Sequence, residues 1–356
     1  MTFPCPQIKS RIIPVPEQNE RSSPNRMNGD QKQIRKGALM EQKKMTFDIP
    51  YIRLGFYAEM LADTRLPASK VSALRGGMGE MLLRQNCVND RKCDGCMFHQ
   101  ACPVYRTLYT PMDPKPRYVT GQESVGYLLE CSDRSEFMRK GDRLVFHLVL
   151  FGESIVYFNL YLQAFALLGM SGLGSARTQF RIAEVRNTEG GKIVSGNHVD
   201  MGKYRYSLVS DYIKRRKAEL GFCDGKYRLT FTAPLAMKYQ KEYMNRFYAE
   251  ALVKGAARRV QMLNYYIGND ADLPEFSRYP VIRSQTVRKE SVKRYSHTQG
   301  GPVTLRGISG QVFFQDMPEE CLNYLIAGEL THMGKCSSFG FGKYYLEQDR
   351  FYLQEK

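Results

Sequence analysis

The feature that most constrains the fold is a short unit that occurs twice: an apolar helix-like stretch, a glycine-rich loop and a strand-like stretch. The first copy spans residues 155–185, and its loop contains Gly172-Leu173-Gly174. The second copy spans residues 318–346, and its loop runs from Gly334 to Gly342. A supersecondary unit that recurs within one chain indicates duplication. We therefore expect two copies of a small α+β domain.

Hydrophobic patterning gives both halves the same order of elements. In the first half we expect strands at 51–61, 124–129, 144–151 and 180–185, and helices at about 69–82 and from 154. In the second half we expect a strand at 227–232 that ends before Pro234, a helix at about 241–266, strands at 283–296 and 303–314, a helix at 318–331 and a last strand from 343. The order βαββαβ is that of a ferredoxin-like (RRM-like) domain. The predicted fold class is therefore α+β, with tandem ferredoxin-like domains.

The same patterning divides the chain into four segments. We expect a disordered tail over 1–44, an N-terminal domain over 45–186 with a cysteine-rich insert at 87–110, a polar connector over 187–225, and a C-terminal domain over 226–350.

The charge of the chain favours an anionic partner. The formal net charge is +16, which points to nucleic acid first and to an anionic membrane second. The uncharged stretch 154–176 contains Asn159, Gln163 and several glycines and serines, so we expect a buried helix there and no membrane partner. The start of the sequence has no apolar signal-peptide core, and nine unevenly placed cysteines do not fit a secreted disulfide scaffold. A cytoplasmic location is expected.

Several segments resemble the CRISPR repeat-processing endoribonucleases of the RAMP superfamily, which cut precursor guide RNA. The resemblance covers about residues 46–347 and rests on 74–79 (Leu-Arg-Gly-Gly-Met-Gly), 93–96 with 102–105, 172–174, 294–296, 305–310 and 328–342. It implies tandem ferredoxin-like domains, RNA held across the cleft between them, and cleavage that needs no metal. Catalytic positions vary within this superfamily, so the fold and the substrate class transfer better than any single catalytic residue.

Metal-independent RNA cleavage needs a base for the 2'-hydroxyl proton, an acid for the departing 5'-oxygen, and positive charge at the phosphate. His332 is the first candidate, because it ends a predicted helix whose dipole favours the imidazolium. Lys335, in the adjoining loop, would supply the charge. The alternatives are a histidine that caps the helix and a lysine that is solvated. His297, after a predicted hairpin strand, is the second catalytic candidate.

A basic segment, 278–306, is the main candidate for RNA binding. Neither face of its predicted strand is apolar, which fits a ribbon over a phosphate backbone; the alternative is a charged edge strand that prevents aggregation. The glycines at 76–79 favour close packing of a helix on a neighbouring element or on RNA. The predicted RNA-binding residues are Arg75, Arg283, Arg288, Lys289, Lys293, Arg294, Tyr295, Gly340, Gly342 and Lys343.

Four cysteines in the insert predict a metal site. Cys87, Cys93, Cys96 and Cys102 lie within sixteen residues and include one Cys-x-x-Cys pair. Four thiolates at such spacing can surround a tetrahedral zinc ion. A structural zinc is favoured over an iron–sulfur cluster and over free thiols.

The function expected from these observations is a metal-independent endoribonuclease that cleaves CRISPR repeat RNA in precursor crRNA. Attack by the 2'-hydroxyl would leave a 2',3'-cyclic phosphate and a 5'-hydroxyl. The alternative is a non-catalytic RAMP subunit that binds crRNA in a CRISPR effector complex. Expected partners are the repeat RNA and other CRISPR effector or adaptation proteins.

Overall fold

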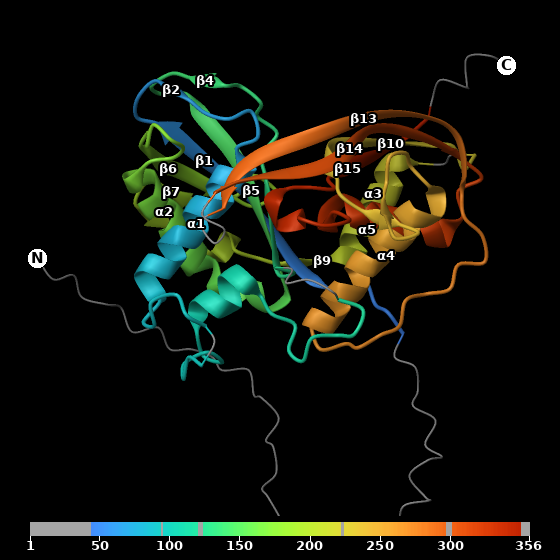
Figure 1. Cartoon of the computed structure of the whole chain (residues 1–356), viewed down its shortest axis with the longest axis horizontal. Helices are drawn as coiled ribbons and strands as arrows, with labels where there is room; N and C mark the ends of the chain where they lie inside the picture. Colours follow the sequence, from blue (N-terminus) through green and yellow to red (C-terminus); the bar gives the residue numbers. More distant parts are fainter. Residues whose placement is uncertain (1–43, 94, 120–123, 222–223, 297–300, 350–356) are drawn as a thin grey trace, which may run out of the picture. The chain divides into compact units, whose positions relative to one another are not determined.

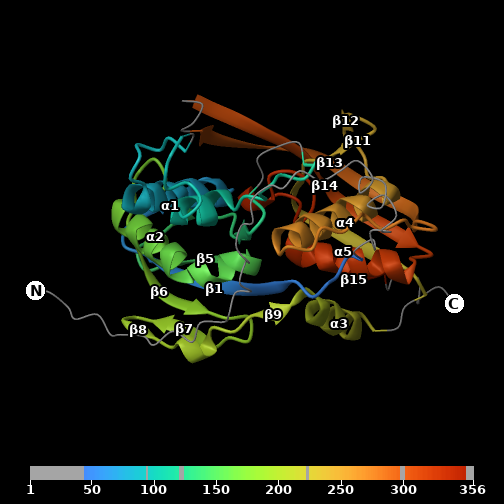
Figure 2. The ribbon, with the colours of Figure 1, turned by 90° about the horizontal axis from the view of Figure 1, so that it is seen from below.

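The first half of the folded chain is an antiparallel sheet covered on one face by two helices. The computed structural model describes residues 44–93, 95–119, 124–221, 224–296 and 301–349, so the predicted tail lies outside the described residues except for Lys44. The sheet has the order β3-β5-β1-β6, formed by β1 (Pro50–Met60), β3 (Tyr127–Glu130), β5 (Arg143–Phe151) and β6 (Phe180–Arg186). The helices are α1 (Val71–Asn86) and α2 (Phe158–Ser171), and a 3-10 turn (Gly152–Tyr157) precedes α2 (Figures 1 and 2).

The second half repeats this arrangement. Its sheet has the order β13-β14-β10-β15, formed by β10 (Tyr227–Leu235), β13 (Val281–Ser296), β14 (Gly301–Gln315) and β15 (Tyr344–Gln348), and its helices are α4 (Ala249–Tyr266) and α5 (Glu319–Thr331). In both halves the spatial order of the four main strands is second, third, first and fourth. The duplicated unit of the sequence therefore corresponds to two halves with the same topology.

Strand residues of the first sheet alternate between two hydrophobic clusters. Leu54 and Phe56 of β1 face the cluster that α1 and α2 cover. Val149 and Phe151 of β5 face a second cluster, which also contains the core of the second half. This alternation follows from the two-residue period of a strand. One face of the first sheet thus packs against its own helices, and part of the other face packs against the second half.

Helix α2 has the length and composition of a possible membrane span when it is taken together with the preceding 3-10 turn (Gly152–Ser171). In the structure it packs against α1 and β6, and Tyr161, Phe165 and Leu168 are buried. The expected helix is present, with one face buried in the first half and the other exposed.

Two predicted elements of the second half differ from the structure. Helix α4 begins at Ala249 and not near 241, because residues 238–243 form a small hairpin of β11 (Lys238–Tyr239) and β12 (Glu242–Tyr243). Pro234 does not end β10: the register shifts between Phe231 and Leu235, and such an irregularity tolerates a residue without an N–H.

The range expected to be a connector, 187–225, contains regular structure. It holds β7 (Lys192–Ser195) and β8 (His198–Val199), which extend the first sheet beyond β6, then a 3-10 turn (Met201–Lys203), β9 (Ser207–Leu208) and α3 (Val209–Leu220). Two further features of the first half lie outside its main sheet. Strand β2 (Thr64–Arg65) pairs with β4 (Phe137–Met138), and residues Tyr105–Tyr109 form a π-helical turn. Helix α3 buries only Val209, Ile213 and Leu220, so its sequence has little of the apolar periodicity that predicts a helix.

A buried ion pair between Arg216 and Glu329 holds α3 against the second half. The Glu329 side chain of α5 is 1% exposed, and Arg216 of α3 donates to it from Nε at 2.8 Å and from Nη2 at 3.0 Å. The hydroxyl of Tyr212 and the backbone N–H of Leu346 donate to the same carboxylate, at 3.1 and 2.6 Å. Arg216 and Tyr212 both belong to α3, and Leu346 belongs to β15, so this one carboxylate joins α3 to α5 and to the second sheet.

We predict that Arg216→Ala lowers the free energy of unfolding by about 3–5 kcal/mol, because it leaves the Glu329 charge buried with no cation beside it. Lys214→Ala is the matched control: that lysine is 79% exposed and its ion pair spans 3.8 Å, so a loss below about 1 kcal/mol is expected. Urea denaturation measures both. Equal, small losses would show that α3 does not depend on this contact.

Candidate functional site

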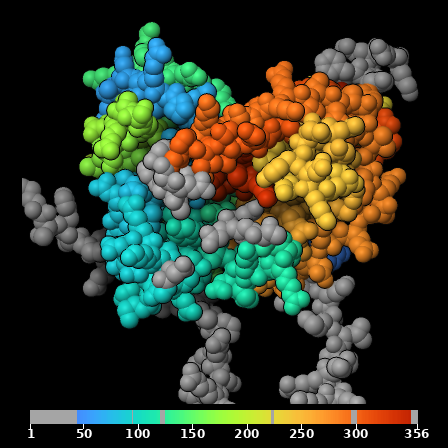
Figure 3. All heavy atoms as spheres, in the orientation of Figure 1, coloured from blue at the N-terminus to red at the C-terminus, as the bar shows by residue number. Residues whose placement is uncertain are grey.

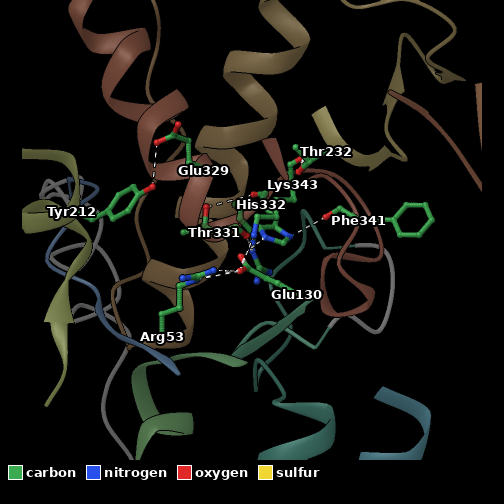
Figure 4. Close-up of polar contacts among 10 residues, drawn as sticks. Arg53, Glu130, Tyr212, Thr232, Glu329, Thr331, His332, Phe341 and Lys343 are labelled. Carbon is green, nitrogen blue, oxygen red and sulfur yellow. Dashed lines mark hydrogen bonds and ion pairs between the residues drawn. The ribbon is translucent and has the colours of Figure 1, made fainter. Parts of the chain in front are cut away.

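A buried carboxylate lies where the two halves meet. Glu130 ends β3, and its side chain is 3% exposed. One oxygen, Oε2, accepts from Arg53 Nη2 at 2.8 Å and contacts Lys343 Nζ at 2.8 Å. The other oxygen, Oε1, lies 3.0 Å from His332 Nε2 (Figure 4). One acid from the first half therefore binds a histidine and a lysine of the second half, together with an arginine of its own half.

His332 is wholly enclosed by protein. It follows the last residue of α5 with a φ of 59°, and its side chain is 0% exposed. Its Nδ1 lies 3.1 Å from the carbonyl oxygen of Phe341, so both ring nitrogens face oxygen acceptors. Burial lowers the pKa of His332, and the neighbouring Glu130 opposes that shift. The ring cannot reach an RNA hydroxyl in this structure, and the contacts it makes are those of a residue that fixes the glycine-rich loop.

Two glycines of that loop are explained by protein packing. Gly342 has a φ of +71°, and a Cβ there would lie 1.8 Å from the backbone oxygen of Met333. Gly340 has a φ of +78°, and its Cβ would lie 3.0 Å from the backbone oxygen of Leu129, in the first half. Both are buried. The structure therefore gives no reason to assign Gly340 or Gly342 to RNA, and Lys343 is already bound to Glu130.

Lys335 is separated from His332 although only two residues lie between them. Its side chain is exposed and lines a cavity of about 450 Å³ together with Tyr118, Lys238 and Arg258. The sequence placed His332 and Lys335 in one catalytic group, whereas the structure buries the first and exposes the second.

The basic segment forms a two-stranded ribbon. The inner part of β14 pairs with both β13 and β10, but residues 301–307 pair with β13 alone. Lys293 lies in this outer part, and Arg288 and Lys289 lie just before it on β13. All three are exposed, and none of them forms an ion pair with a described residue. Arg283 differs: its Nη2 lies 2.5 Å from the buried carboxylate of Asp349. The side chain of Tyr295, and all of His297, lie outside the described residues.

Arg75 and Arg294 come together on one aromatic ring. Their guanidinium carbons lie 4.5 and 4.6 Å from the centroid of Phe339. Arg75 belongs to α1, Arg294 to β13, and Phe339 to a 3-10 turn (Ser337–Phe339) in the glycine-rich loop. Figure 3 shows the ribbon (orange) on the face toward the viewer, beside the cyan region that contains α1. Two residues predicted separately to bind RNA thus form one composite surface.

The four cysteines of the insert line one pocket of about 480 Å³, together with His99. Within the described ranges, however, no three His, Cys, Asp or Glu side chains lie close enough to hold a metal ion together. Zinc binding would require the insert to close around the metal, as is common where metal binding and folding are coupled. The zinc site remains a prediction.

Sequence reasoning missed Glu130, Arg53 and Phe339. The signal for Glu130 was present: an acid follows Tyr127-Leu128-Leu129 in a strand whose four residues are all buried. A carboxylate in such a strand requires a buried partner. The identity of the partner depends on how the halves dock, which the sequence does not state.

We predict that Glu130→Gln destabilises the protein at neutral pH by about 3–5 kcal/mol, since it leaves Arg53 and Lys343 without their counter-ion. Burial raises the pKa of Glu130, but the hydrogen bond with His332 and the charges of Lys343 and Arg53 hold it well below 4.5. A carboxylate with a depressed folded-state pKa contributes stability above pH 4.5 and loses it as the pH falls toward the folded-state value. The lowered pKa of His332 acts in the same direction below pH 6.5.

Urea denaturation at a series of pH values checks this prediction. The free energy of unfolding should fall with acidification more steeply in the wild type than in Glu130→Gln. Glu189→Gln, in an exposed turn, is the control and should follow the wild type. Parallel curves for the wild type and Glu130→Gln would contradict a stabilising role of the Glu130 charge.

Comparison with known proteins adds two family matches. Residues 49–205 match a family model described as an N-terminal domain. Residues 229–344, which include the ribbon, His332 and the glycine-rich loop, match the model of the CRISPR-associated endoribonuclease Cas6. No curated protein is similar enough in sequence to match the chain.

Solved structures share the mixed α+β fold. A chain of a partial Cas6-RT-Cas1–Cas2 complex has a TM-score of 0.53 and 12% identity, over 87% of this chain and 47% of that chain. This chain therefore spans about half the length of that one. A Cas6 product complex has a TM-score of 0.48 and 13% identity, over 83% of this chain and 99% of that chain. A Thermus thermophilus Cas6 has a TM-score of 0.47 and 11% identity, over 84% and 98%. At these identities structural likeness describes the fold alone. The sequence similarity to the Cas6 model covers residues 229–344, about a third of this chain.

Proposed function

We propose that this protein is an endoribonuclease that cuts CRISPR repeat RNA within precursor guide RNA. The observation that carries the proposal is the exposed cationic ribbon within the part of the chain that matches the Cas6 family. Arg288, Lys289 and Lys293 have no carboxylate partner among the described residues, so they are available to phosphates. The net charge of +16 supports the same substrate class.

The proposed reaction is attack of a 2'-hydroxyl oxygen on the adjacent phosphorus. A new 2'-oxygen–phosphorus bond forms as the bond to the 5'-oxygen breaks. The 2'-hydroxyl loses its proton and the departing 5'-oxygen gains one, so the products are a 2',3'-cyclic phosphate and a 5'-hydroxyl. The proton transfers are suited to histidine, whose usual pKa of about 6.5 lies close to neutral pH.

Two of the histidines are buried, which makes them poor candidates for these proton transfers. His332 is enclosed, and burial lowers the pKa of His147 in β5 to about 4. We therefore assign the transfers to His297, which follows β13 by one residue in the sequence. His99 is the second candidate, because it lines the cavity beside Arg75. Lys335 keeps its proposed role of supplying positive charge at the phosphate.

The shared topology supports the finer fold assignment. Each half has the element order βαββαβ and the same strand order, which is the pattern of a ferredoxin-like (RRM-like) domain. We propose tandem ferredoxin-like domains that carry the RNA between them. RNA is the principal partner in this proposal, and adaptation proteins are further ones, since one similar chain is part of a Cas6-RT-Cas1–Cas2 complex.

One observation favours the alternative of a non-catalytic subunit that binds crRNA. The first catalytic candidate, His332, is bound on both sides by Glu130 and Phe341. The alternative predicts RNA affinity without a cut.

We predict that the purified protein cuts its own repeat RNA at one position in the presence of EDTA. The upstream fragment should end in a 2',3'-cyclic phosphate, and a 2'-deoxy nucleotide 5' of the cut should abolish cleavage. His297→Ala should slow single-turnover cleavage by at least about 100-fold, the usual scale for loss of a general acid or base. His332→Ala should lower stability but keep the cut. Tight binding without a cut would favour the non-catalytic subunit. Loss of the cut in EDTA, in protein that keeps its fold and its zinc, would contradict metal-independent chemistry.

We also propose a structural zinc at Cys87, Cys93, Cys96 and Cys102, supported by their spacing and their common pocket. Elemental analysis should find about one zinc per chain, and Cys93→Ser should lose it, whereas Cys131→Ser in the first half should retain it. Absorbance in the visible range would instead indicate an iron–sulfur cluster. Purified protein with neither metal, and with all four thiols reactive, would contradict the site.

A further inference from the structure

Two arginines from different halves lie over the same aromatic ring, and neither is paired with a carboxylate among the described residues. The guanidinium groups of Arg75 and Arg294 lie 4.5 and 4.6 Å from the centroid of Phe339. Within the described part of the chain neither forms an ion pair, and each has a buried Nε atom with no hydrogen-bond partner. Burial and the neighbouring charge of Arg75 lower the pKa of Arg294. Two like charges held this close repel each other, and an anion would relieve that repulsion.

A helical glycine beside Arg75 leaves open space on the same helix. A Cβ at Gly76 would meet no heavy atom within 4 Å, whereas a Cβ at Gly77 would lie 2.4 Å from Leu168 Cδ1. Packing on α2 therefore explains Gly77 but not Gly76. Glycine in a helix interior costs about 1 kcal/mol, so an unpacked one indicates that something other than protein packing favours its small size. A bare backbone lets another backbone approach closely.

The space next to Arg75 has the composition of a nucleic-acid surface. Arg75 lines a cavity of about 880 Å³, and basic and aromatic side chains make up about half of the rest of its lining: Arg91, Lys92, Lys115, His99, Tyr105 and Tyr109. Of these, Arg91 is paired with Glu80. Asp113 is the only acid in that lining. Cationic groups interleaved with aromatic rings suit a single-stranded backbone with splayed bases. Arg294, which lies over the same ring, belongs to strand β13 of the ribbon.

We propose that Arg75 and Arg294 form one phosphate-binding site on the ring of Phe339, and that it holds the phosphodiester backbone of single-stranded RNA between the cavity and the β13–β14 ribbon. The inference rests on the proposed function, which supplies RNA as the anion. Stacking on the ring fixes the plane of each guanidinium and leaves outer N–H groups for phosphate oxygens. The site exists only when both halves are docked, since each half contributes one arginine.

The test measures binding of a fluorescein-labelled polyuridine RNA by anisotropy at several salt concentrations. This RNA contains no repeat, so binding reports the backbone site separately from cleavage. Arg75→Gln and Arg294→Gln should each weaken binding about tenfold, and each should reduce the slope of log affinity against log salt by about 0.7 per lost phosphate contact. Lys214→Gln is the matched control for loss of charge, because Lys214 lies on α3, on the side of Figure 2 opposite the ribbon.

Thermal stability without RNA separates a binding role from a structural one. Removing one of two repelling arginines should leave the melting temperature unchanged or raise it. A fall in melting temperature with unchanged RNA affinity and unchanged salt slope would overturn the proposal and make the pair a packing feature. Failure of the wild type to bind polyuridine would also overturn it. If the wild type binds and the variants do not, the site stands even where no repeat RNA is cut.

Discussion

The arrangement of the two halves depends on the buried carboxylate of Glu130. It has a single negative charge, and it binds Arg53 from its own half and His332 and Lys343 from the other (Figure 4). Removing such a charge from water is costly unless its partners are well placed, so this cluster contributes more to specificity than to net stability. The cluster is complete only when the two halves are docked, because Glu130 and Arg53 come from one half and His332 and Lys343 from the other. Every surface built from both halves, including the ring of Phe339 with its two arginines, follows from that docking.

This constraint changes the meaning of the glycine-rich loop. In the sequence the loop resembles a phosphate-binding element beside a catalytic histidine. In the structure its glycines allow the loop to press against Met333 and Leu129, and the flanking residues His332 and Lys343 are bound to Glu130. The loop instead presents Phe339, on which Arg75 and Arg294 lie. The glycines, His332 and Lys343 therefore fix the loop, whereas Phe339 is the loop residue that carries the two arginines.

The sequence predicted the architecture well, because periodicity and the repeated glycine-rich unit are local signals. The strands β1, β5, β6, β13 and β14 and the helices α1 and α5 lie close to their expected positions. Helix α3 was missed because its polar sequence is held by a tertiary ion pair, and the start of α4 was displaced by a small hairpin. The site was harder to predict, since the burial of His332 and the meeting of Arg75 with Arg294 are properties of docking. Residue types indicated which groups carry charge, but not which charges are already paired.

The most direct test of this account is a structure of the protein bound to repeat RNA that carries 2'-deoxy nucleotides to prevent cleavage. The account predicts that the backbone crosses the ring of Phe339, with phosphate oxygens at Arg75 and Arg294 and further contacts to Arg288, Lys289 or Lys293. It also predicts that His332 stays buried against Glu130. RNA bound along α3 and β8, or His332 turned out to contact the cleaved phosphate, would contradict it.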